Sequence, residues 1–79
     1  MSEETIRKLI TEQFNQKHIL KDIAVDQDFF EVGASSLSIV DLQIQIEQAL
    51  KLSVPTSDLM RDPTLGRWIA AYAQVAERT

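Results

Sequence analysis

Apolar side chains recur at helical spacing in three separate stretches of the chain. The outer two stretches, residues 3–16 and about 65–76, have their apolar positions at Ile6, Leu9, Ile10 and Phe14, and at Leu65, Trp68, Ile69, Tyr72 and Val75. An apolar residue every three to four positions on one face is typical of an amphipathic helix. Glu3 and Glu4 complement the positive end of the first helix dipole. The chain is therefore expected to fold from helices.

The middle stretch, residues 36–50, carries apolar residues on two faces. One stripe consists of Ile39, Leu42, Ile46 and Leu50, and a second of Leu37, Val40 and Ile44. A helix with more apolar surface than one core face requires is either central to a bundle or partly exposed to a partner. For Val40 and Ile44 the sequence leaves both alternatives open: they complete the core, or they face a partner.

The remaining segments connect these helices. Residues 17–35 show no sustained periodicity but contain seven apolar residues, so we expect this long connection to be held against the helices, with one helical turn over residues 20–23. Pro55 and Pro63 bracket a short helix over about 56–60. The predicted fold is all-α: a small four-helix bundle of three main helices and a short third one, with a long structured loop between the first two, in a single domain over residues 1–79.

Size and composition exclude several classes of function. The 79 residues include no cysteine, so disulfides and thiolate metal sites cannot form. A net charge of −4 repels nucleic acid and anionic membranes, and a DNA-binding helix-turn-helix is disfavoured because no helix is basic. No apolar run approaches the roughly 20 residues that span a bilayer. We expect a cytoplasmic, free-standing monomer.

Residues for catalysis are scarce. His18 is the single histidine, so a nucleophile would depend on one loop residue as its base. The carboxylates are scattered without the spacing of a calcium loop, and Gly33 and Gly66 are too far apart to form a phosphate-binding loop. The residues therefore favour a binding or carrying role over an enzyme.

Ser35 and Ser36 stand immediately before the middle helix. Serine is a common N-cap, and a helix start favours anions, including a phosphate attached to a side chain. Helix physics alone does not choose between capping and carrying a phosphate.

The segment "DFFEVGASSLSIVDLQIQIEQALKLSVPTSDLMRDPTL" resembles the core of the acyl and peptidyl carrier proteins of fatty acid, polyketide and nonribosomal peptide synthesis. The family pattern has an aspartate followed by an apolar residue, then Gly-x-Asp-Ser-Leu, a central apolar helix, "V-P" and "P-T". The matching residues are Asp28, Phe29, Gly33, Ser36, Leu37, Pro55, Pro63 and Thr64.

The resemblance implies that Ser36 carries 4′-phosphopantetheine, transferred from coenzyme A by a phosphopantetheinyl transferase. The thiol of the arm would hold an acyl or aminoacyl group as a thioester, which also accounts for the missing cysteine. Such a carrier is not an enzyme. Its partners would be an adenylating or acyltransferase loading enzyme and downstream biosynthetic enzymes.

Two features depart from the family pattern or vary within it. Ser35 stands where the family usually has aspartate; it can cap the helix but offers no carboxylate to a metal-bearing transferase. The docking surface implied by the family comprises Leu37, Val40 and Ile44, flanked by Asp41 and Glu47. It is less acidic than in fatty acid carriers, which favours polyketide or nonribosomal peptide-type pathways. A fatty acid-type carrier and an unmodified, carrier-like interaction module remain the alternatives.

Overall fold

The structure is a computed structural model that describes residues 2–78. Its helices are α1 (Glu3–Asn15), the short 3-10 helix η1 (His18–Leu20), α2 (Ser36–Leu50), α3 (Thr56–Arg61) and α4 (Leu65–Arg78). Residues 2–78 contain no strand. The all-α prediction is confirmed, and the ends of the four α-helices lie within two residues of their expected positions.

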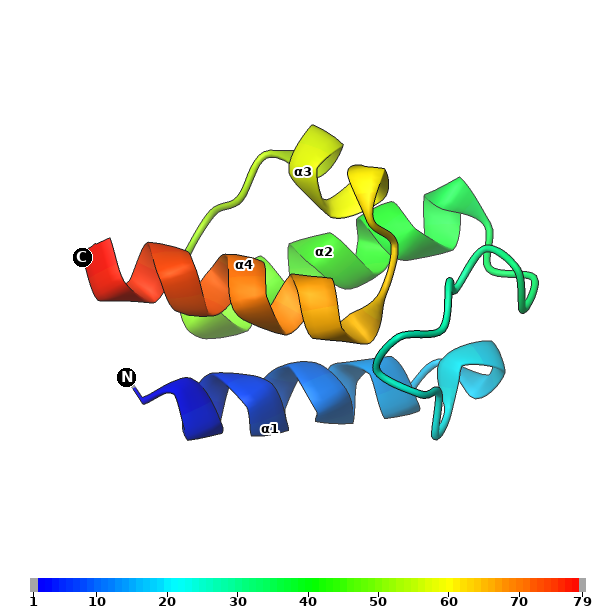
Figure 1. Cartoon of the computed structure of the whole chain (residues 1–79), viewed down its shortest axis with the longest axis horizontal. Helices are drawn as coiled ribbons and strands as arrows, with labels where there is room; N and C mark the ends of the chain where they lie inside the picture. The colour runs from blue at the N-terminus through cyan, green and yellow to red at the C-terminus, as the bar shows by residue number, and fades with distance from the viewer. Residues whose placement is uncertain (1, 79) are drawn as a thin grey trace.

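The helices form a bundle in which α1 packs against both α4 and α2, and α3 packs against α4 (Figure 1). α1 runs antiparallel to α4 and to α2, so the first turn of α1 and the last turn of α4 lie at one end of the bundle. The start of α2 and the long α1–α2 loop lie at the opposite end. The start of α2 is therefore remote from the first turn of α1 and the last turn of α4.

The core is built from the apolar faces that the sequence predicts. Ile6, Ile10 and Phe14 of α1 are fully buried, as are Ile39, Leu42 and Ile46 of α2. An aromatic cluster joins α1, the loop and α4: the Trp68 ring centroid lies 5.3 Å from that of Phe14 and 5.7 Å from that of Phe29, both edge to face. Such pairs add to the stabilisation from area burial alone. The cluster ties the loop to the bundle.

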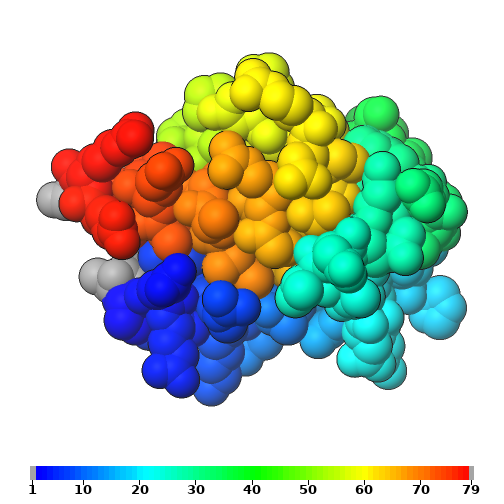
Figure 2. Space-filling view, in the orientation of Figure 1, coloured from blue at the N-terminus to red at the C-terminus, as the bar shows by residue number. Residues whose placement is uncertain are grey.

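Backbone hydrogen bonds hold the α1–α2 loop as well. The Phe29 N–H donates to the Pro63 carbonyl at 2.9 Å, and the Gly66 N–H donates to the Val25 carbonyl, also at 2.9 Å. A Cβ at position 66 would lie 3.0 Å from the Val25 carbonyl oxygen, a tight contact that the Val25 backbone could relieve only by shifting, so glycine suits this close approach. The loop side chains fill the space beside α1 and the start of α4 (Figure 2). The expectation of a structured loop is confirmed.

The expectation of a helical turn over residues 20–23 is wrong. The turn forms earlier, as η1, and the backbone at Asp22 is left-handed, with φ 60°. The Asp22 N–H donates to the Asn15 side-chain oxygen at 2.9 Å, which holds this conformation. A residue with positive φ cannot continue a right-handed helix.

Candidate functional site

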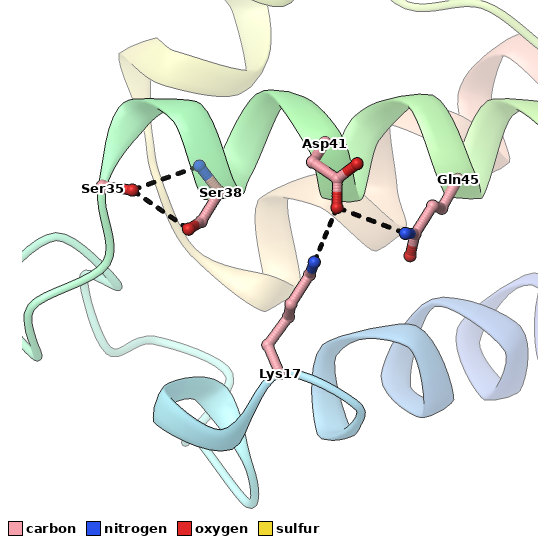
Figure 3. Close-up of polar contacts among 5 residues, drawn as sticks. All are labelled: Lys17, Ser35, Ser38, Asp41 and Gln45. Carbon is pink, nitrogen blue, oxygen red and sulfur yellow. Dashed lines mark hydrogen bonds and ion pairs between the residues drawn. The ribbon is translucent and has the colours of Figure 1, made fainter.

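Ser35 and Ser36 take different positions at the start of α2. Ser35 is the N-cap, with extended backbone, and its Oγ accepts a hydrogen bond from the Ser38 N–H at 3.2 Å. The Ser35 hydroxyl also donates to Ser38 Oγ at 3.0 Å (Figure 3). The expectation that a serine caps this helix is confirmed, and that serine is Ser35.

Ser36 is the first residue of α2 and is exposed to solvent. Within residues 2–78, no hydrogen bond engages its hydroxyl. The Ser38 N–H is already taken by the cap, whereas the N–H groups of Ser36 and Leu37 have no acceptor inside the helix. An accessible hydroxyl beside unpaired backbone donors fits a site where a serine carries a phosphate group.

Gly33 closes the loop that leads into α2. Its φ is +103°, a conformation that residues with a Cβ rarely adopt, and a Cβ there would lie 3.0 Å from Ile19 Cδ1. The turn is fixed by hydrogen bonds from the Gly33 N–H to the Phe30 carbonyl and from the Ala34 N–H to the Phe29 carbonyl, each 3.1 Å. Gly33 therefore acts through the backbone, by directing the chain into the helix start.

The second apolar stripe of α2 lies on the surface. Leu37 is 82% exposed, Ile44 50% and Val40 37%. Of the two alternatives for this stripe, completion of the core is therefore wrong. We call Leu37, Val40 and Ile44 the apolar stripe.

Asp41 lies beside the apolar stripe and is paired within the molecule. The Lys17 ammonium, at the end of α1, lies 2.7 Å from Asp41 Oδ2, and the Gln45 amide donates to the same oxygen at 3.2 Å (Figure 3). Ion pairs this exposed add little stability, but they occupy the carboxylate. Lys17 was missed by sequence reasoning, because it lies 24 residues before Asp41 with no local signal.

Glu47, the other acidic residue expected to flank the docking surface, is half-buried and internally bonded. Its Oε2 accepts hydrogen bonds from the Tyr72 hydroxyl at 2.9 Å and from the Val54 N–H at 3.0 Å. Burial, together with the Glu47 carboxylate, raises the pKa of the Tyr72 phenol well above its usual range. This carboxylate joins α2 to α4 and to the segment before α3.

Gln43 contributes to the same network from inside the fold. Although it is polar, Gln43 is only 6% exposed. Its amide donates to Glu47 Oε2 at 3.2 Å and to the Val54 carbonyl at 3.1 Å, and its oxygen accepts from the Thr56 hydroxyl at 3.0 Å. A buried amide is retained here because each of its groups has a partner.

Residues 2–78 also lack two other features. No group of three or more histidine, cysteine, aspartate or glutamate side chains is placed to hold a metal ion. None of the described helices is both long enough and apolar enough to cross a membrane.

Comparisons with known proteins agree with this geometry. The family described as "Phosphopantetheine attachment site" matches residues 4–72, which include every residue of the site. Among curated proteins, a polyketide synthase-nonribosomal peptide synthetase of Aspergillus flavipes, ffsA, is 40% identical over 47 residues, which is 60% of this chain. The match covers only 1% of that synthetase. No solved structure gives a significant match.

The family match extends over most of the chain, and the helical bundle is consistent with it. The chain therefore belongs to the phosphopantetheine-binding carrier protein family, whose domain attaches 4′-phosphopantetheine covalently.

Proposed function

We propose that this protein is a non-catalytic carrier that tethers acyl or aminoacyl intermediates as thioesters and presents them to partner enzymes. The observation that supports this function best is the exposed, unengaged hydroxyl of Ser36 at the start of α2, inside the family match. When attached, the 4′-phosphopantetheine arm supplies the thiol that forms the thioester. Residues 1–79 form one carrier domain in this proposal.

The residues around Ser36 have distinct roles in the proposal. Ser35 caps the helix and fixes the backbone on which Ser36 stands, and Gly33 provides the turn that precedes it. The unpaired N–H groups of Ser36 and Leu37 favour the negative charge of a phosphodiester. Ser36 alone offers a free hydroxyl at the helix start, because the Ser35 hydroxyl donates to Ser38.

The partners follow from this role. A phosphopantetheinyl transferase would modify Ser36, an adenylating or acyltransferase enzyme would load the arm, and downstream biosynthetic enzymes would use the cargo. The similarity to a polyketide synthase-nonribosomal peptide synthetase supports a pathway of that type over fatty acid synthesis. We assign docking to the apolar stripe with Asp41 and Glu47, and we expect the carrier to act as a monomer.

A second function, that of an unmodified carrier-like interaction module, is favoured by one observation: the neutral Ser35 at the cap. A transferase that contacts an acidic residue before the modified serine would find none here. The apolar stripe would serve such a module without any prosthetic group.

Intact mass spectrometry distinguishes the two functions. The protein is incubated with coenzyme A and a broad-specificity phosphopantetheinyl transferase, and we expect a gain of one phosphopantetheine. Ser36→Ala should abolish the gain, whereas the matched variant Ser35→Ala should retain it. No gain in the native protein, with the fold intact by circular dichroism, would support the unmodified module. A gain that survives Ser36→Ala but is lost in Ser35→Ala would move the attachment site to Ser35.

A further inference from the structure

Two shallow hollows adjoin each other on the exposed surface of α2, and Ile44 lines both of them. The first, nearer Ser36, is lined by Lys17, Leu37, Ser38, Val40, Asp41 and Ile44. The second, towards the end of α2, is lined by Ile44, Glu47, Gln48, Lys51, Leu52 and Ser53. Ile44, which is half exposed, is the residue that the two hollows share.

The charges around these hollows cancel. Each hollow is lined by one basic and one acidic residue, namely Lys17 and Asp41 in the first and Lys51 and Glu47 in the second. The net charge of −4 carried by the whole chain is therefore contributed entirely by residues outside this surface. A basic partner would be attracted to the molecule as a whole but would find no excess of acid at the hollows.

Both acidic side chains are also bound to neighbours within the protein. Asp41 Oδ2 lies 2.7 Å from the Lys17 ammonium and accepts from Gln45, and Glu47 Oε2 accepts from Tyr72 and Val54. An arginine or lysine of a partner would have to displace Lys17, or compete for an oxygen that already has several donors. In contrast, burial of Leu37, at 82% exposure, requires no such exchange.

We propose that this surface binds its partner enzyme through an uncharged, apolar patch that places one protruding apolar side chain in each hollow, on either side of Ile44. The proposal rests on the carrier function proposed above and specifies the chemistry of the partner. Lys17 determines this specificity, because its pairing with Asp41 neutralises the one acidic residue that lines the first hollow.

Isothermal titration calorimetry with the broad-specificity transferase, in the absence of coenzyme A, tests the proposal. We expect a negative heat capacity change on binding, and a Kd that changes less than about twofold between roughly 50 and 500 mM salt. Leu37→Ala should weaken binding about tenfold at both salt concentrations, because one large apolar contact is lost. Gln74→Ala, an exposed change on α4, is the control and should leave Kd unchanged.

Variants of Lys17 test its role in specificity. Lys17→Met keeps the aliphatic stem but leaves Asp41 without its cation, so binding to an uncharged patch should weaken by about fivefold at both salt concentrations, because an unpaired carboxylate must be desolvated. The double variant Lys17→Met/Asp41→Asn should return to the Kd of the native protein. This double variant separates the effect of the unpaired charge from any change in the backbone at Lys17.

The outcomes separate this proposal from the carrier function. A native Kd that rises steeply with salt, a Leu37→Ala variant that binds as the native protein does, or no detectable binding overturns the apolar interface, even if Ser36 is modified. Salt-independent binding that Leu37→Ala weakens supports the interface, even if the mass of the protein never increases. Binding to the transferase does not require transfer of the phosphopantetheine. A result that contradicts the apolar interface therefore does not contradict the modification of Ser36, and the reverse is also true.

Discussion

The two apolar faces of α2 are made of the same kinds of side chain but differ in their burial. Ile39, Leu42 and Ile46 are fully buried against the rest of the bundle, whereas Leu37, Val40 and Ile44 stand in solvent. The difference lies in what is packed opposite each face, since α1 covers the first and nothing among the described residues covers the second. Apolar composition therefore identifies both faces, but only the packing shows that the chain buries the first and leaves the second, the docking surface proposed above, exposed.

The largest expected effect comes from truncating one isoleucine on each face. Ile46→Ala should lower the free energy of unfolding by about 2–5 kcal/mol, because it removes buried methyl groups and leaves a cavity. Ile44→Ala, two residues earlier and half exposed, should change it by less than about 0.5 kcal/mol. Urea denaturation followed by circular dichroism measures both values. Equal losses would mean that the faces are not distinct.

A second prediction concerns the polar network that lies at the border of the two faces. Tyr72→Phe removes the hydrogen bond to Glu47 and should cost about 1 kcal/mol at neutral pH. The raised pKa of Tyr72 also gives stability a pH dependence: above its ordinary value of about 10, the unfolded chain releases the phenolic proton while the folded chain keeps it. The native protein should therefore lose stability as pH rises beyond that value.

The Tyr72→Phe variant carries no phenol, so it should lose less stability over the same alkaline range. Urea midpoints at a series of pH values on both sides of 10.0, the ordinary pKa of tyrosine, give the comparison. Because the lysines titrate in both proteins, the informative quantity is the difference between the two curves. Parallel curves would show that Tyr72 ionises equally readily in the folded and unfolded chains.

The smallest single change is expected at the helix start, for a charged cap at Ser35. Ser35→Ala loses the cap and should cost about 1 kcal/mol, whereas Ser35→Asp keeps the capping oxygen and adds a charge suited to the dipole, a gain of about 0.5 kcal/mol. Thermal unfolding of the three proteins at low ionic strength measures the order. Destabilisation by Ser35→Asp would mean that the Ser35–Ser38 hydroxyl pair matters more than the charge.

The sequence was sufficient for most of the fold because helical periodicity is a local signal. The buried face of α2, the faces of α1 and α4 and the serine cap all depend on residues within a few positions of one another. The same local reasoning could not place η1, because the left-handed backbone at Asp22 depends on a hydrogen bond that the Asp22 N–H donates to the Asn15 side-chain oxygen, in the preceding helix.

The candidate site was predictable only in part, for the same reason. Periodicity identified the apolar stripe, but only the packing of α1 on the other face decided that Val40 and Ile44 are exposed. The pairs Lys17–Asp41 and Glu47–Tyr72 join residues 24 and 25 positions apart. Gln43 gave a weak local signal, since it stands four residues before Glu47, a spacing at which helical side chains meet.

In the carrier proposed above, the anchoring of the α1–α2 loop has a consequence for the range of movement of the prosthetic arm. The loop that leads to Ser36 is bonded to the segment around the start of α4 at Pro63 and Gly66, and Phe29 fixes it in the core. Ser36 would therefore be a fixed pivot, and the reach of the arm would depend on its own length rather than on bending of the protein. Because the start of α2 lies at the end opposite the first turn of α1 and the last turn of α4, the arm would sweep a volume away from those two turns (Figure 1).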